Sequence, residues 1–263
     1  MRRVLLRGEA RDLETALDLL HLACDVHGVV ERDREAEVWF DGVAPSFDRL
    51  AIGVDELPND AFAAPSTGFE LDAVIQVSPR IVVRPPWVAA PLGFCGTELI
   101  VPRGMAFGSG EHGSTQAALL VLDALWSDPA PRSLLDVGTG SGILAAFGAR
   151  RGATVIAACD VESASVAAAR ELLPGADVRL GGPEVFAPAR FDAVVANLDA
   201  HQLGQALDAI LTRWNGVGPL VLSGLRPGQD DAIVLRMTRA PSVRMERLGY
   251  VALGVAPCDV EGA

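Results

Sequence analysis

The sequence contains no lysine, and all 22 of its basic residues are arginine. Without lysine the chain cannot form a Walker-type nucleotide site, a Schiff base or the tyrosine–lysine pair of some reductases. A genome biased toward arginine codons is the simpler origin of the absence. Whole classes of mechanism are nevertheless excluded.

Cysteines are few, and long apolar runs are missing. The four cysteines are far apart and form no C-x-x-C pair, which predicts reduced core residues and neither disulfides nor a metal site (Cys24, Cys95, Cys159, Cys258). The apolar character of the N-terminal residues fades after Leu6, so we expect no signal peptide, and no segment is long enough to span a bilayer. These features predict a cytoplasmic protein.

The charge balance restricts the possible partners. Half of the residues are hydrophobic and 21% are charged, which is typical of a folded globular protein. The formal net charge of −12 argues against direct nucleic-acid binding, because phosphate neutralisation needs clustered cations. A basic protein substrate would be attracted instead.

A glycine-rich motif lies near the middle of the chain. Leu134–Leu144 reads L-L-D-V-G-T-G-S-G-I-L, which predicts a buried strand, a tight turn and the start of a helix. The glycines are Gly138, Gly140 and Gly142, and Ile143 stands where a dinucleotide fingerprint has its third glycine. Following Asp136, this G-x-G-x-G pattern resembles the S-adenosylmethionine loop of class I methyltransferases.

Asp160 ends the second predicted strand, 18 residues beyond Gly142. A carboxylate at this place can accept hydrogen bonds from both hydroxyls of a ribose. Nicotinamide enzymes use the same device, so Asp160 indicates a ribose-bearing cofactor without identifying it. An N-cap of the helix that starts near Ser163 is the alternative interpretation, and Glu162 is a weaker candidate for the ribose contact.

Two further features are expected at the same edge of the sheet. Asn197 is one of three asparagines and follows the fourth predicted strand, where its amide could contact both an incoming amine and the cofactor; a turn asparagine is the alternative. The glycine-rich segment Met105–Thr115 contains Phe107 and His112 and is either a lid or a plain loop. Its last residues can cap a helix whose N-terminus faces an anion.

Periodicity divides the chain into two parts. Residues 1–56 predict a strand, a helix that ends near His27–Gly28, and two more strands, a small α+β unit of ferredoxin-like type whose second helix, around Phe47–Ile52, is poorly marked. Residues 57–79 predict a linker. Residues 80–263 alternate between strands and helices, which predicts an α/β fold with a mostly parallel sheet. A final hairpin of Val243–Leu248 and Tyr250–Val255 predicts one antiparallel strand at the edge of that sheet.

Three motifs together resemble the PrmA family, the ribosomal protein L-eleven methyltransferases. Ala106–Thr115 reads A-F-G-S-G-E-H-G-S-T, the glycine loop follows, and Val195–Leu198 reads V-A-N-L. The resemblance implies a Rossmann-like class I methyltransferase domain with a seven-stranded sheet, behind a small domain that docks the ribosomal protein. Compared with the family pattern, Ser109 and Ser114 replace threonines, and residues 55–62 replace a tryptophan-rich linker.

The resemblance also implies an activity, the S-adenosylmethionine-dependent N-methylation of lysine or α-amino groups on a large-subunit ribosomal protein. We expect the protein to be a monomer. We expect Asn197 and the Leu198 carbonyl to orient the amine, with water or His112 taking the proton. The expected cofactor contacts are Phe107, Thr115, Asp136, Gly138, Gly140, Gly142, Asp160 and Asn197.

Three alternatives stay open at this point. The first is the same fold acting on another protein or on a small-molecule amine. The second is a non-catalytic ribosome-binding module. The third is a nicotinamide-dependent oxidoreductase, which Ile143 and the missing tyrosine–lysine pair disfavour.

Overall fold

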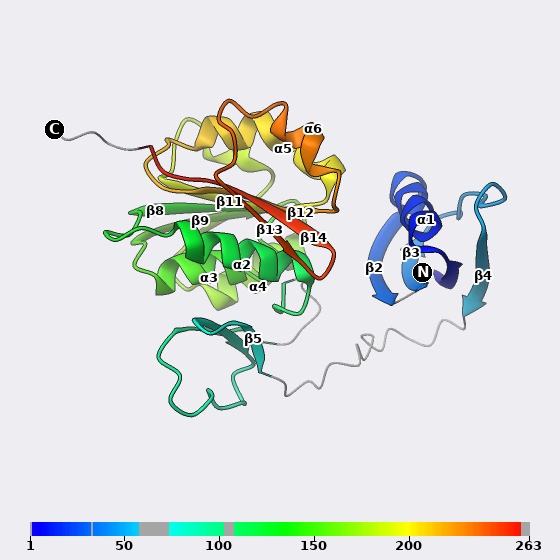
Figure 1. Cartoon of the computed structure of the whole chain (residues 1–263), viewed down its shortest axis with the longest axis horizontal. Coiled ribbons are helices and arrows are strands. Elements are labelled where there is room, and N and C mark those ends of the chain that lie inside the picture. Colours follow the sequence, from blue (N-terminus) through cyan, green and yellow to red (C-terminus); the bar gives the residue numbers. More distant parts are fainter. Residues whose placement is uncertain (1, 33, 58–73, 103–107, 259–263) are drawn as a thin grey trace. The chain divides into compact units, whose positions relative to one another are not determined.

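The structure is a computed structural model that describes residues 2–32, 34–57, 74–102 and 108–258 (Figure 1). These residues form two compact units, one on each side of residues 58–73. Among the described residues, no helix is long and apolar enough to cross a membrane.

The first unit is a four-stranded antiparallel sheet with one helix. Its elements are β1 (Arg2–Gly8), α1 (Ala10–Ala23), β2 (Asp25–Arg32), β3 (Glu35–Asp41) and β4 (Ile52–Leu57), and the strand order is β2-β3-β1-β4. The apolar face of α1 packs on one face of the sheet, with Leu6, Leu20 and Phe40 fully buried between them. The unit is of α+β type, and its ferredoxin-like character stays a prediction.

Two details of this unit differ from the prediction. The helix ends at Ala23, and the predicted stop at His27 and Gly28 lies inside β2. The pairing of β2 with β3 shifts register between Val26 and Gly28. No helix forms in residues 42–51, which are fully described. Phe47 and Leu50 cover the core from a single turn, closed by a hydrogen bond between the Leu50 N–H and the Phe47 carbonyl.

The second unit is built on a seven-stranded sheet, as the family resemblance implies. Its strands are β8 (Ser133–Val137), β9 (Val155–Asp160), β10 (Asp177–Leu180), β11 (Ala193–Asn197), β12 (Leu220–Leu225), β13 (Val243–Arg247) and β14 (Tyr250–Val255), in the order β10-β9-β8-β11-β12-β14-β13. The first five strands in this order are parallel, and β14 is antiparallel to both of its neighbours. The antiparallel strand is therefore one position in from the edge, and not at the edge as predicted.

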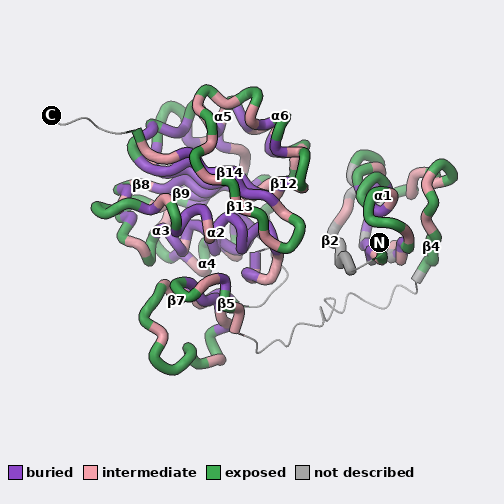
Figure 2. The backbone as a smooth tube through the Cα atoms, in the orientation of Figure 1, coloured by how far each residue is buried: buried purple, intermediate pink, exposed green. Residues whose placement is uncertain are grey.

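Helices cover both faces of this sheet, which makes it a three-layer α/β fold (Figure 1). One face carries α2 (Gly113–Leu125), α3 (Ile143–Arg150) and α4 (Ser163–Leu172), and the other carries α5 (Ala200–Arg213) and α6 (Asp230–Val234). A short 3-10 helix, η1 (Pro183–Phe186), follows β10. The central strands are buried on both faces (Figure 2), as expected for parallel strands between helical layers.

A three-stranded sheet precedes the large one in the chain. It consists of β5 (Ile75–Ser78), β6 (Ile81–Arg84) and β7 (Thr97–Ile100), in that spatial order, and its apolar side joins the core around α2 and α3. Because β4 ends at Leu57 and β5 starts at Ile75, the ends of the predicted linker 57–79 belong to strands. The remainder of that linker lies mostly outside the described residues.

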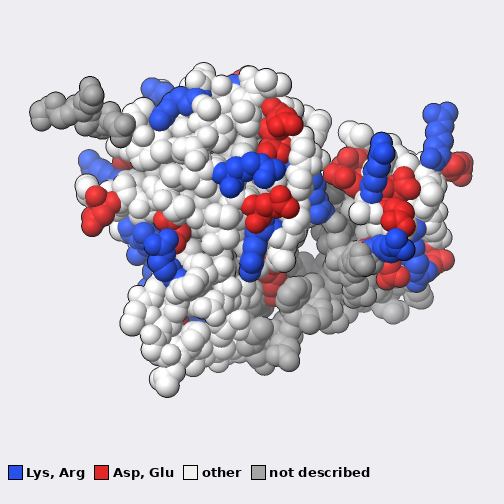
Figure 3. All heavy atoms as spheres, in the orientation of Figure 1, with Lys and Arg blue, Asp and Glu red and all other residues white. Residues whose placement is uncertain are grey.

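The loop between β6 and β7 has an unusual composition. Residues 85–96 contain no charged side chain, and this part of the molecule is white in Figure 3. Trp87 and Leu92 in this loop are exposed, at 59% and 106% of their full accessible surface.

Candidate functional site

The predicted site residues converge where the strand order of the large sheet reverses. From β8 the chain proceeds to β9 on one side, and β11 lies on the other side. Asp160 is the last residue of β9, and Asn197 is the last residue of β11. In open parallel sheets, ligands bind in the crevice at this reversal, outside the carboxyl ends of the strands.

The turn after β8 has a backbone conformation that favours glycine. Gly138, Gly140 and Gly142 have φ angles of +68°, +52° and +88°, in the left-handed region that residues with a Cβ rarely adopt. A Cβ on Gly138 would lie 2.3 Å from Cδ2 of Leu198. Gly138 therefore has no room for a side chain, because Leu198 fills the space where its Cβ would lie.

Asp160 is buried and holds the turn in place. Its Oδ2 accepts a hydrogen bond from the Gly140 N–H at 2.9 Å, and its Oδ1 accepts one from the Glu162 N–H at 3.0 Å. The N-cap residue of α4 is Glu162, so Asp160 is not that cap. Each carboxylate oxygen keeps a second lone pair, so the predicted ribose contact is compatible with these bonds.

Asp136 is fully buried below the same turn. Its Oδ2 accepts hydrogen bonds from the Thr139 hydroxyl at 2.7 Å and from the Ala145 N–H at 3.1 Å. Burial raises the pKa of this carboxyl to about 7, although the two hydrogen bonds oppose the rise. Its Oδ1 is buried without a hydrogen-bond partner. A buried acceptor without a donor is costly, which indicates a place for a cationic or N–H group of a ligand.

Thr115 and Asn197 meet across the site. Thr115 lies in the first turn of α2, and its hydroxyl oxygen accepts a hydrogen bond from Nδ2 of Asn197 at 3.3 Å. Strand β12, the neighbour of β11, is joined to the same N-terminal turn of α2, since the Ser223 hydroxyl donates to the Ser114 carbonyl at 2.9 Å. The structure thus brings together two predicted residues that are 82 positions apart.

The backbone of Leu198, the residue after Asn197, is held by two contacts. Its N–H donates to the Ser223 carbonyl at 3.0 Å, and a Cβ on Gly224 would lie 2.1 Å from its carbonyl oxygen. The close approach of Gly224 fixes the direction of the carbonyl that is predicted to orient an amine. That role stays a prediction.

His112 is poorly suited to accept a proton. Its Nδ1 is 2.7 Å from the Ser114 hydroxyl, and its ring lies 4.3 Å from the ring of Tyr250. Burial, and secondarily the charge of Arg226, lower its pKa to about 4. A group with such a pKa is neutral at pH 7 but too weak a base to take a proton from an alkylammonium. The geometry favours the hydrogen-bonding role of His112.

The predicted lid is partly described. Phe107 lies outside the described residues. The part that follows is fastened to the site: the Ser141 hydroxyl of the glycine turn donates to the Gly108 carbonyl at 2.8 Å. Nε2 of Gln116 donates to the carbonyls of Gly110 and Glu111. Residues 108–112 are therefore bound to both the turn and α2.

The sequence interpretation missed two residues beside this site, Arg226 and Tyr250. Arg226 follows β12, and its guanidinium carbon lies 4.1 Å from the centre of the Tyr250 ring. The only available signal was that Tyr250 is the single tyrosine in the chain.

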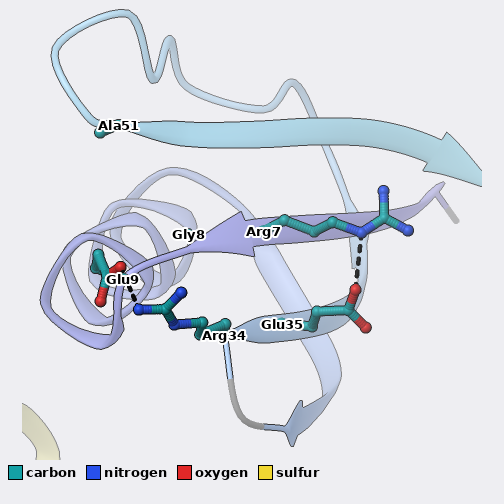
Figure 4. Close-up of a pocket in the computed structure, with 6 residues that line it drawn as sticks. All are labelled: Arg7, Gly8, Glu9, Arg34, Glu35 and Ala51. Carbon is teal, nitrogen blue, oxygen red and sulfur yellow. Dashed lines mark hydrogen bonds and ion pairs between the residues drawn. The ribbon is translucent and has the colours of Figure 1, made fainter.

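The remaining polar features of the described residues suggest no second centre. These residues contain no group of three or more side chains suited to hold a metal ion, and burial raises the pKa of Cys159 to about 12. A cavity of about 460 Å³ in the first unit is lined by Arg7, Gly8, Glu9, Arg34, Glu35 and Ala51 (Figure 4). Its arginines pair with Glu35 at 2.8 Å and Glu9 at 2.6 Å, so the charges balance and none of the predicted residues lies there.

Comparison with known proteins agrees with this site. Residues 73–247 match the family model described as ribosomal protein L11 methyltransferase (PrmA). Curated relatives of that name include one from Polynucleobacter necessarius, 34% identical over 191 residues, and one from Sorangium cellulosum, 33% identical over 198 residues. These alignments cover 68% and 73% of this chain but only 57% and 62% of the relatives.

A solved structure gives the same result for the fold. The ribosomal protein L11 methylase from Lactobacillus delbrueckii subsp. bulgaricus superposes with a TM-score of 0.63 at 25% identity, covering 70% of this chain and 98% of that one. The family model covers two thirds of the chain, including the turn after β8, Asp160 and Asn197, and it leaves out the first unit. The chain belongs to the family of ribosomal protein L11 methyltransferases (PrmA).

Proposed function

We propose that this protein transfers a methyl group from S-adenosylmethionine to an amine of a ribosomal protein of the L11 type. The observation that carries the proposal is the edge at which β8, β9 and β11 end. There a glycine-rich turn, the buried carboxylates of Asp136 and Asp160, and the Thr115–Asn197 pair come together. Family membership supports the same activity.

The residues of this edge fit the parts of the cofactor. Asp160 can accept from the ribose hydroxyls, and Val161 beside it is 74% exposed, so its apolar side chain can cover a base. The unpartnered Oδ1 of Asp136 suits the cationic amino-acid end. Ile143, 2% exposed at the start of α3, leaves no glycine for the close helix approach of a dinucleotide site. Phe107 would close the site, as the family resemblance implies.

When bound, the cofactor supplies an activated methyl group on a sulfonium. The protein aligns the acceptor: Asn197 and the Leu198 carbonyl orient the amine, with Thr115 fixing the asparagine side chain. The amine must be neutral to attack, and His112 is too weak a base to deprotonate it. The proton therefore leaves to water.

The charge distribution supports a basic substrate. Residues 1–57 carry thirteen acidic and seven basic side chains, so this part supplies half of the net charge of −12. Such a surface attracts the lysine- and arginine-rich proteins of a ribosome. We infer that the first unit recognises the substrate, and that the protein acts as a cytoplasmic monomer.

Methyl transfer can be tested with purified ribosomal protein L11, labelled S-adenosylmethionine and mass spectrometry. We expect labelled amines with the wild-type protein, and loss of labelling with Gly140→Val. Gly175→Val is the matched control, because Gly175 is also left-handed at +96° but has no heavy atom within 4 Å of its missing Cβ. Tight cofactor binding without transfer to L11 would favour another amine acceptor or a non-catalytic module.

A further inference from the structure

A buried glutamine connects residues 108–112 with the hairpin of β13 and β14. Gln116 lies in the first turn of α2, and only 5% of its surface is exposed. Its Nε2 donates to the Gly110 carbonyl at 3.2 Å and to the Glu111 carbonyl at 3.1 Å. Its Oε1 accepts a hydrogen bond from Nε of Arg247 at 3.0 Å. One side-chain amide thus joins the loop before α2 to a strand 131 positions further along the chain.

The partners of this amide allow only one orientation of it. A guanidinium can only donate, and a backbone carbonyl can only accept. If the amide were turned by 180°, its NH₂ group would face the Arg247 donor and its oxygen would face two carbonyl oxygens. Burial keeps water from relieving such a mismatch. Arg247 therefore determines that the two N–H groups of Gln116 point at residues 110 and 111.

The hairpin that carries Arg247 is itself fixed against the start of α2. A Cβ on Gly113 would lie 2.6 Å from the Arg247 carbonyl oxygen and 2.8 Å from Cβ of Leu248. On the far side of the hairpin turn, the Tyr250 ring lies 4.3 Å from the ring of His112. The donor to Gln116 therefore has a defined position relative to the helix.

The other end of residues 108–112 contacts the glycine turn of the cofactor site. The Gly108 carbonyl accepts from the Ser141 hydroxyl at 2.8 Å, and Ser141 stands between Gly140 and Gly142. A Cβ on Gly110 would lie 2.8 Å from Cγ1 of Val83, so the same segment is also close to β6. The segment is confined between the glycine turn, β6 and Gln116. A change at Gln116 is thereby transmitted to the turn.

We propose that Gln116 is a positioning residue that holds residues 108–112 against the glycine turn and so sets the affinity for S-adenosylmethionine, with Arg247 orienting its amide. The proposal rests on the function proposed above for the identity of the ligand. Without the two N–H donors, the carbonyls of residues 110 and 111 have to turn to water, which draws the segment away from the turn. The apparent affinity then falls in proportion to the fraction of molecules that keep the ordered arrangement.

The test combines calorimetry with S-adenosylmethionine and steady-state kinetics with L11 at pH 8. Gln116→Glu keeps an acceptor for Arg247 but has no N–H for the two carbonyls. Its Kd and KM for the cofactor should rise about tenfold, with unchanged binding stoichiometry and kcat within about twofold of wild type. Arg247→Met keeps the donors but frees the amide to turn, so a loss of about threefold is expected. Gln205→Glu adds the same charge on the exposed side of α5 and should bind as wild type.

A purely structural role of Gln116 would give a different result. It would lower the stoichiometry and kcat through loss of folded protein and leave Kd unchanged, and an unchanged Kd in Gln116→Glu overturns the proposal. If Gln116→Glu does not fold, an unchanged Kd in Arg247→Met overturns it equally.

Failure of the proposed function is separable from failure of this inference. If wild-type protein binds the cofactor but transfers no methyl to L11, the proposed acceptor is wrong, and the comparison of Kd values still decides the role of Gln116. If wild-type protein does not bind S-adenosylmethionine, hydrogen exchange decides it. The amides of residues 108–112 should then exchange faster in Gln116→Glu than in wild type, and equal rates overturn the inference.

Discussion

Replacing Asp136 with asparagine should stabilise the protein and weaken cofactor binding at the same time. The carboxyl of Asp136 has its pKa raised from 3.8 to about 7 by burial, which corresponds to about 4 kcal/mol against the charged form. Asparagine removes this cost and keeps an oxygen for the Thr139 and Ala145 donors. Its amide nitrogen would lack a partner at the position of Oδ1, at a cost of about 1–3 kcal/mol.

Subtracting the cost of the unpaired amide nitrogen from the relieved cost of the buried charge gives the net gain. The free energy of unfolding should rise by roughly 1–3 kcal/mol at pH 8. The gain depends on pH in a defined direction. Between pH 4 and 7 the native carboxyl binds a proton that the unfolded one has lost, so wild-type stability falls as the pH rises, by about 1.4 kcal/mol per unit. The asparagine side chain of the variant does not titrate, and the advantage of the variant should grow over this range.

Urea denaturation at several pH values between 5 and 8, followed by a probe of the second unit, measures both effects. Calorimetry with S-adenosylmethionine should show a loss of affinity of about a hundredfold, because a charged hydrogen bond of about 2–3 kcal/mol is removed. Asp123→Asn is the contrast: that buried carboxylate pairs with Arg80 and Arg151, so its loss should destabilise. An Asp136→Asn variant that is less stable than wild type at pH 8, or whose advantage does not change with pH, refutes the reasoning.

The parts of the site that the sequence predicted are those that a short local pattern determines. A strand followed by G-x-G-x-G must turn with positive φ, and a polar residue at the end of a parallel strand must lie at the ligand edge. Asp160 and Asn197 follow this rule, so their placement needed only the alternation of strands and helices. The seven-stranded sheet followed from the family resemblance.

The missed features depend on tertiary contacts. Gly28 was interpreted as a helix stop, but it lies at the register shift between β2 and β3. The final hairpin lies at the sheet edge, but its antiparallel strand, predicted to be the edge strand, is β14, which inserts between β12 and β13. This insertion places Tyr250 against Arg226. The contact cannot be read from the sequence, because β14 comes last along the chain but lies between β12 and β13 in the sheet.

Three further substitutions test the geometry of the site. Gly138→Ala should lower cofactor affinity at least tenfold, since its Cβ would clash with Leu198, whereas Gly175→Ala carries only left-handed strain of about 1 kcal/mol and should bind normally in calorimetry. Asp160→Asn should weaken binding about a hundredfold, because the amide nitrogen would face one of two backbone N–H groups that now donate to the carboxylate. Asn197→Ala should affect transfer more than binding: the side chain, which Thr115 holds, is predicted to contact both the cofactor and the amine, so cofactor affinity should fall only modestly, while kcat should fall about a hundredfold through lost alignment. Equal losses in affinity and kcat would instead place Asn197 among the cofactor residues alone.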